Sequence, residues 1–175
     1  MAMIVQIDIA TLGTPTWTTN ITSCKWSLDD AQSGTTPIPT PTATGTNFSF
    51  VKSFKVDITN VGASLTMTNV KIGTTTSPAT GLKLWHQKHT TYTQATAAPT
   101  STGDNNSTAP TINGTAAVAG GMVLIGSAAV LLAGPFTTTG RQGDHIEVCL
   151  GVDNGNTGSG STVAVPTLRF QWTEA

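Results

Sequence analysis

Two segments of the chain place histidines at spacings that could support chemistry, and the first is His86-Gln87-Lys88-His89. On a helix, this spacing would bring both imidazoles to one face, where they could share a metal ion. The apolar alternation that begins at Leu82 predicts a strand instead, and in a strand His86 and His89 point to opposite faces. No cysteine or acidic residue lies nearby in the sequence. We therefore predict no metal site, and we expect His86 to face solvent or a subunit contact.

The second segment is Asp144-His145-Ile146-Glu147, in which His145 and Glu147 share one face of an expected strand. A histidine and a carboxylate on one face could act as an acid and base pair. Their alternation with Ile146 and Val148 favours the polar side of an edge or outer strand. The chain is rich in serine, but no Gly-x-Ser-x-Gly segment marks a serine nucleophile. We therefore predict no catalytic residue.

The segment from Asp153 to Gly158 begins like a calcium loop, with oxygen-bearing side chains on a glycine-rich turn. The twelfth position is Ala164, where such a loop needs a glutamate that binds the ion through both oxygens. The segment therefore predicts a turn without a bound cation, and no motif in the chain indicates a cofactor.

The aromatic residues fall into two groups by their surroundings. Trp26 and Trp172 alternate with apolar neighbours and fit core faces. Trp17, Trp85 and Tyr92 could line a surface that stacks on sugars or binds a protein, or they could pack in the core or an interface. Both interpretations stay open from the sequence.

Composition limits the class of protein. Only 10% of the 175 residues are charged, the net charge is -1, and 35 residues are threonine. Threonine is branched at Cβ and suits strands, so an all-β protein is expected. No cluster of lysine or arginine is present that could neutralise a run of phosphates, which argues against a nucleic-acid partner. Low charge also offers little protection from self-association and favours a homo-oligomer.

Alternation of apolar and polar residues predicts about eight strands in a single domain that spans residues 1–175. The clearest is Phe48–Thr59, in which only Lys52 breaks the pattern. In the strand that follows, the apolar parity changes near Thr68-Asn69, which predicts a β-bulge. Long polar loops, above all residues 87–120, connect the strands. We predict an antiparallel β-sandwich of jelly-roll type, with these segments extended: 3–9, 21–28, 48–59, 65–72, 82–86, 122–125, 129–132, 145–150 and 163–172.

Ala116–Gly134 is an uncharged stretch of 19 residues, near the length of a membrane-spanning helix. Its alanine and glycine content and the absence of lysine or arginine near its ends argue against that interpretation. We expect two short buried strands, Met122–Ile125 and Ala129–Leu132, and no membrane partner.

The first residues alternate apolar and polar side chains, so 1–15 could form an extended arm that pairs within its own sheet or with a neighbouring subunit. They lack the features of a secretory signal, and we expect the protein to stay in a cytosol. Cys24 and Cys149 are then expected to be buried free thiols, with a disulfide as the alternative.

Three stretches resemble the jelly-roll decoration or minor capsid proteins of tailed bacteriophages: Phe48–Gly73, Gly134–Asp153 and Pro166–Ala175. The resemblance is one of pattern, and it transfers no family binding residue to a numbered position. It implies a protein without enzymatic activity, assembled in the host cytoplasm into a virion as a homo-oligomer, often a trimer. Its partners would be the major capsid protein or other virion subunits.

The alternative function is a carbohydrate-binding module or a phage tail adhesin that recognises a host-surface glycan through exposed aromatic residues. For the capsid function, we expect the N-terminal arm to reach across a subunit boundary, and for the glycan function we expect exposed aromatic residues to bind. The residues expected to contact a partner are Ile4, Val5, Ile7 and Ile9 of the arm and the aromatic residues Trp17, Trp85 and Tyr92.

Overall fold

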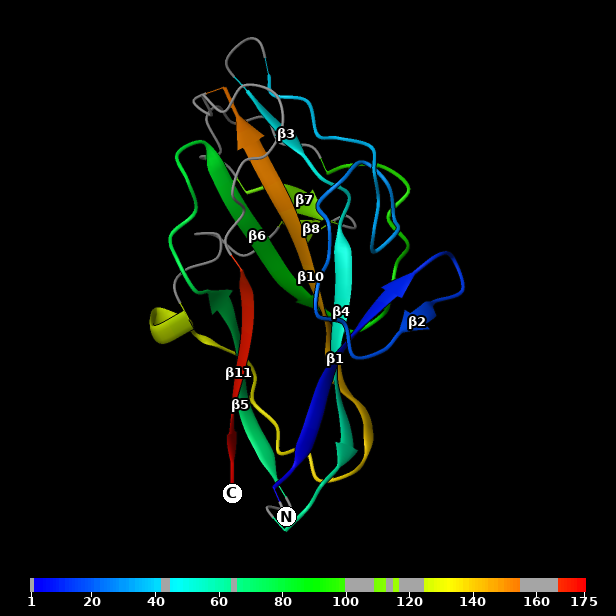
Figure 1. Ribbon diagram of the computed structural model, residues 1–175, viewed down its shortest axis with the longest axis vertical. Helices are drawn as coiled ribbons and strands as arrows, with labels where there is room; N and C mark the ends of the chain where they lie inside the picture. The colour runs from blue at the N-terminus through cyan, green and yellow to red at the C-terminus, as the bar shows by residue number, and fades with distance from the viewer. Residues whose placement is uncertain are drawn as a thin grey trace.

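The computed structural model describes residues 2–41, 45–63, 66–99, 109–112, 115–116, 125–154 and 167–175. Within these residues the protein is all-β, as predicted, and every strand pairing is antiparallel (Figure 1). The elements are β1 (Ile4–Thr11), β2 (Thr16–Thr18), β3 (Thr46–Phe48), β4 (Lys52–Asn60), β5 (Met67–Thr74), β6 (Leu82–His89), β7 (Thr111–Ile112), β8 (Thr115–Ala116), the 3₁₀ turn η1 (Ile125–Ser127), β9 (Val130–Leu132), β10 (Gly140–Asp153) and β11 (Leu168–Glu174).

Two sheets form the body of the protein. The larger has six strands in the order β2-β1-β4-β10-β3, with β6 paired to β10, and the smaller has the order β11-β5-β9. Strands β7 and β8 form a separate hairpin. The main hydrophobic core contains side chains of both large sheets, for example Val56 and Val148 from the first and Val70 and Ile72 from the second. The all-β antiparallel expectation is therefore confirmed, while the jelly-roll strand order stays a prediction.

β10 is the central element of the larger sheet. It is 14 residues long and pairs with β4 and β3 along one side and with β6 along the other. Ile146, Val148 and Leu150 point into the main core, as predicted. The prediction of an outer strand with a solvent-facing polar side is wrong, because His145 is 7% exposed and Glu147 is 0% exposed. Both faces of β10 are covered.

β1 is a strand of the chain's own sheet rather than a detached arm. Residues Ile4–Ala10 pair with β4, and Ile9–Thr11 pair with β2. Of the two pairings considered for the N-terminal segment, the structure has the one within the same chain. The alternation of the sequence is the reason, since Val5, Ile7 and Ile9 all pack against the main core.

The segment expected to form one strand over Phe48–Thr59 is two strands, β3 and β4. They are interrupted at Ser49–Val51, where Ser49 bonds to β10 through both its backbone and its side chain. Lys52, the residue that broke the pattern, is 1% exposed on the core-facing side of β4. Its ammonium donates to the carbonyl oxygens of Asp29 and, at 2.8 Å, of Ala31. A lysine was acceptable among apolar residues because a loop supplies its hydrogen-bond acceptors.

That loop contains the segment 21–28, which we expected to be a strand and which is not one. It is held by single backbone bonds to β1 and within itself, such as Ile21 N to Ile7 O at 2.9 Å and Lys25 N to Gln32 O at 2.9 Å. Trp26 still packs against the main core, as predicted, because the loop folds over the end of the larger sheet.

The bulge predicted in β5 is present. Lys71 pairs with Gln171 and Thr68 pairs with Thr173, so two residues of β5 face one residue of β11. Asn69 lies within the bulge, where β5 has one residue more than β11, and its φ is 54°. The bulge brings Met67 and Val70 to the same buried side despite their odd spacing.

The apolar stretch 116–134 contains η1 and β9, and β9 confirms that the second expected segment is a strand. The expectation that this strand is buried is wrong, because β9 is an edge strand beside β5 and its Val130 is 44% exposed. For the first, residues 122–124 lie outside the described residues and Ile125 begins η1. Among the described residues, no helix has the length and apolar character to cross a membrane. In the long connection after β6, residues 100–108, 113–114 and 117–120 are outside the described part of the chain, as is Val163–Pro166 before β11.

Candidate functional site

The residues with chemical potential lie on the face of the larger sheet that points away from the smaller sheet; we call it the polar face. Strand register aligns its members across five strands, since Trp17 pairs with Ala10, Ala10 with Ser53, Ser53 with Glu147 and Glu147 with Gln87. Alternation places their neighbours in the main core. The polar face comprises Gln6, Asp8, Trp17, Ser53, Lys55, Asp57, Gln87, Arg141, His145 and Glu147.

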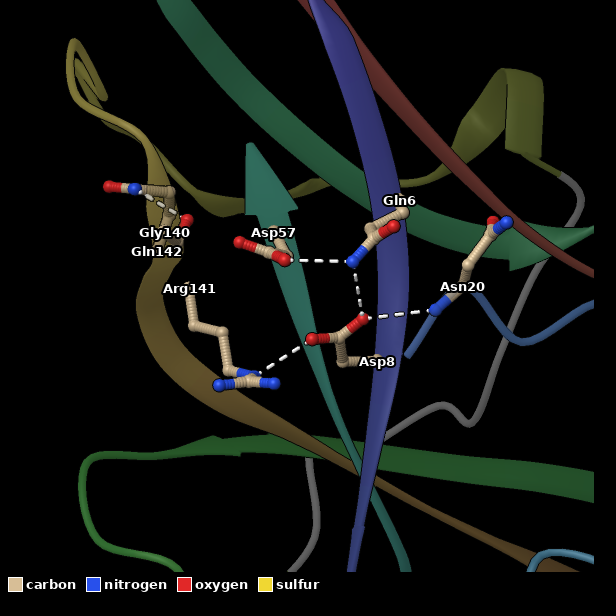
Figure 2. A network of polar contacts seen from close by, with 7 residues as sticks. All are labelled: Gln6, Asp8, Asn20, Asp57, Gly140, Arg141 and Gln142. Carbon is tan, nitrogen blue, oxygen red and sulfur yellow. Dashed lines mark hydrogen bonds and ion pairs between the residues drawn. The ribbon is translucent and has the colours of Figure 1, made fainter. Parts of the chain in front are cut away.

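Asp8 is the centre of a hydrogen-bonded network at one end of the polar face (Figure 2). Its side chain is 0% exposed, and its Oδ2 accepts from Arg141 Nε at 2.8 Å. Its Oδ1 accepts from the backbone N–H of Asn20 at 3.1 Å and from Gln6 Nε2 at 3.2 Å. Gln6 Nε2 also donates to Asp57 Oδ2 at 2.8 Å. Both carboxylate oxygens of Asp8 are thus occupied, as a buried charge requires.

An aromatic cluster around His145 continues the network. The Trp17 ring stacks on the imidazole with centroids 5.8 Å apart and planes at 22°, and the Tyr92 ring lies 5.7 Å away at 44°. The Arg141 guanidinium lies 4.3 Å from the Trp17 ring centroid, within the range of a cation–π contact. Arg141 therefore links the Asp8 network to the aromatic cluster.

Ser53 and His145 make the contact that a serine nucleophile makes with its base, with Oγ and Nδ1 3.2 Å apart. Both side chains are covered, with exposures of 3% and 7%. Burial, reinforced by the nearby Lys55, lowers the pKa of His145 to about 4, against the opposing effect of Asp144. The imidazole is neutral at pH 7, and its bond to Ser53 joins β10 to β4.

Glu147 and Gln87 form the other end of the polar face. Gln87 Nε2 donates to Glu147 Oε2 at 2.7 Å and to the carbonyl oxygen of Ile112 at 3.2 Å, so it joins β6 and β10 to the β7–β8 hairpin. Beyond them the face becomes apolar, in a second hydrophobic cluster that includes Trp85, Cys149 and Ile112.

Tyr92 ends in a buried hydroxyl that makes no hydrogen bond to the residues that the structure describes. Burial raises the pKa of Tyr92 to about 12, and the negative charges of Asp30 and Glu147 act in the same direction. The hydroxyl therefore remains protonated and carries an unused hydrogen-bond donor beside the His145 ring.

The structure separates the residues expected to contact a partner. Ile9 is 0% exposed and Trp85 is 1% exposed, so neither can contact a partner from its present position, and these two predictions are corrected. Ile4 is 51% exposed. Val5 and Ile7 are half-buried against the main core. Trp17 and Tyr92, which lie 75 positions apart in the sequence, are both half-buried and contact the same imidazole.

The histidines of β6 lie on opposite faces, as the strand predicts, since His89 pairs with His145 and His86 pairs with Val148. His86 is half-buried, and burial lowers its pKa. Within the described part of the chain, its Nδ1 has no hydrogen-bond partner. Across the described residues, no three side chains among histidine, cysteine, aspartate and glutamate gather as metal ligands.

Cys24 and Cys149 are free thiols, which confirms the first of the two interpretations. Cys149 is buried in the second cluster and Cys24 is half-buried. Burial raises the pKa of both thiols, to about 11 for Cys24, where the positive charge of Lys52 partly offsets it. Neither thiol is therefore ionised at pH 7.

Sequence reasoning missed Asp8, Ser53, Gln87 and Arg141. Asp8 and Arg141 are 133 positions apart in the sequence. Each lies at an alternate polar position of its strand, and this pattern predicts only a solvent-facing side chain. Comparisons with protein-family models, with curated proteins and with solved structures find no match to this chain.

Proposed function

We propose that this protein is a non-enzymatic structural protein of a phage virion, a decoration subunit that binds and stabilises the head shell through its outer surface. The observation that carries the proposal is the internal use of its polar groups. Asp8 bonds Arg141, Ser53 bonds His145 and Glu147 bonds Gln87. Arg141 is partly exposed, and the other five side chains are buried. Polar side chains that hydrogen-bond to one another in this way make a sheet more rigid. Catalysis needs polar side chains that a substrate can contact.

The resemblance of three segments to decoration and minor capsid proteins supplies the location, the virion, and the partner, the major capsid protein. A rigid β-domain with little charge suits a subunit whose surface is covered by neighbouring subunits. In a symmetric shell, many weak contacts between subunits add together.

Co-sedimentation tests this function. The major capsid protein proposed as the partner is assembled into empty heads and mixed with the purified protein at increasing concentration. We expect saturable binding at a fixed ratio to the shell subunits and a higher melting temperature of the shell. Heads that sediment without the protein at every concentration would overturn the proposal.

A second candidate function, binding of a host-surface glycan, is favoured by the meeting of Trp17 and Tyr92 at His145. Aromatic faces beside polar donors, here the half-buried Trp17 ring beside Arg141, are the groups that stack on sugar rings and bond their hydroxyls. A glycan array probed with the wild-type protein and with Trp17→Ala decides this candidate. Binding lost in Trp17→Ala and kept in the exposed control Thr16→Ala would favour it, and an array without signal would remove it.

A further inference from the structure

The outer edge of β11 differs from the edges formed by β2, β3, β6 and β9. β2, β3 and β9 are each three residues long, and β6 carries Lys83 and Lys88, which discourage strand addition. β11 ends the order β11-β5-β9 and is seven residues long, with neither lysine nor proline (Figure 1). It thus has the length of a pairing edge, and its charged residues are Arg169 and Glu174.

The ladder with β5 shows which backbone groups of β11 point outward. Thr75 N donates to Thr167 O at 3.1 Å, and Ala175 N donates to Thr66 O at 3.1 Å. Backbone groups of alternate residues point to the same side of an antiparallel strand. Thr167, Arg169 and Gln171 therefore face β5, whereas the N–H and C=O groups of Leu168, Phe170 and Trp172 face the outer edge.

The side chains of the same three residues face the main core and are only half-buried. A strand added at this edge would cover them and use their outward backbone groups at the same time. On the opposite side of β11, Arg169, Gln171 and Thr173 are exposed.

We propose that two copies of this protein pair through β11, antiparallel and about a two-fold axis at Gln171, so that the two smaller sheets become one continuous sheet. This register places Phe170 opposite Trp172 of the second copy, and the reverse, which makes two aromatic cross-strand pairs. Arg169 lies opposite Thr173 of the second copy, and the two Gln171 side chains face each other.

The register is self-consistent in three respects. Residues with outward backbone groups oppose residues of the same kind, core-facing side chains oppose core-facing side chains, and no like charges meet. A contact that repeats itself about a two-fold axis closes as a dimer, so the protein in solution is a dimer rather than the trimer implied by the resemblance. As a unit for assembly on a shell, this dimer rests on the proposed function, but its existence in purified protein is independent of any shell.

Gln171 gives the sharpest test, since its side chain is exposed in the monomer and lies on the two-fold axis of the dimer. Gln171→Lys and Gln171→Glu each place like charges face to face in the shared ladder. Sedimentation velocity from about 1 to about 100 micromolar measures the association. We expect a dimer for the wild type, at least about tenfold weaker association for each variant, and a restored dimer when the two variants are mixed.

The control is Thr16→Lys, which adds the same charge at an exposed position of β2 and should leave the dimer intact. Circular dichroism and melting temperature check that each variant folds. Should a charged variant fail to fold, Gln171→Cys replaces it, and its oxidation should yield a covalent dimer on a non-reducing gel.

A wild-type protein that stays monomeric over this range would overturn the proposal. So would a dimer that both charged variants leave unchanged. Neither result depends on shell binding, which the co-sedimentation experiment measures separately. Failure of the dimer proposal can therefore be distinguished from failure of the proposed function.

Discussion

Ser53 Oγ lies 3.2 Å from His145 Nδ1, between neighbouring strands of the larger sheet and beside a Trp17 ring that stacks on the same imidazole. Two residues that could form a nucleophile and a base are here a cross-strand link. The consequences of this arrangement can be measured through stability.

The first prediction concerns acid. The pKa of His145 is about 4 in the folded protein and 6.5 as its ordinary value, so the unfolded chain binds a proton more readily between these limits. Acidification then favours unfolding. The contribution of neutral His145 to the free energy of unfolding is complete above about pH 6.5, and it is lost as the pH falls toward 4.

Urea unfolding at pH 7 and pH 5 measures this loss. In His145→Gln, which keeps a hydrogen-bond partner for Ser53, we expect a smaller drop between the two pH values than in the wild type. His89→Gln removes the cross-strand neighbour and serves as the control, with a drop close to that of the wild type. Equal drops in the wild type and in His145→Gln would contradict the assignment.

The second prediction concerns the buried carboxylate of Asp8. Asp8→Asn removes the charge that pairs with Arg141 and should lower the free energy of unfolding by about 2 kcal/mol. In the double variant with Arg141→Gln, the loss should be smaller than the sum of the two single losses, because both changes break one contact. Asp30→Asn, which removes the charge from a more exposed bond to the N–H of Leu12, should cost less than about 1 kcal/mol. Additive losses in the double variant would argue against a coupled network.

The third prediction concerns the loop held by Lys52. Lys52→Met keeps the apolar stem and removes the ammonium, which leaves the carbonyl oxygens of Asp29 and Ala31 without this donor. We expect a loss of about 2 kcal/mol in the free energy of unfolding and faster proteolytic cleavage within residues 24–34. Lys25→Met changes an exposed lysine of the same loop and should alter neither quantity. A cleavage rate in Lys52→Met equal to that of the control would count against the anchor.

The fourth prediction concerns the bulge in β5. Asn69 has a φ of 54°, a conformation that costs most residues about 1 to 2 kcal/mol and glycine almost nothing. Asn69→Ala should therefore lower the melting temperature, while Asn69→Gly should leave it nearly unchanged. If the alanine variant melts no lower than the glycine variant, the bulge does not need this conformation.

Period-two burial made much of the fold predictable. The alternation in β4 and β10 predicted their core-facing residues Phe54, Val56, Ile58, Ile146, Val148 and Leu150 correctly. The parity change at Thr68-Asn69 located the bulge. The failure at residues 21–28 has a physical cause: a loop that packs Trp26 on the core shows the same apolar spacing as a strand. Local spacing does not reveal whether a segment finds a pairing partner.

The polar face was harder to predict, since polar residues on alternate positions look the same whether water or protein covers them. Burial of Glu147 and His145 depends on Tyr92 and the β7–β8 hairpin, which come from the aperiodic segment between β6 and β9. The ion pair of Asp8 with Arg141 depends on β1 and β10 both lying beside β4, and that follows from topology alone.

In the proposed function, the polar face stabilises the fold and the outer surface binds the shell. The decisive measurement is shell binding by the Ser53→Ala and His145→Gln variants below their melting temperatures. We expect the wild-type ratio of bound protein to shell subunits for both variants, in spite of their lower stability. Folded variants that no longer bind the shell would contradict it.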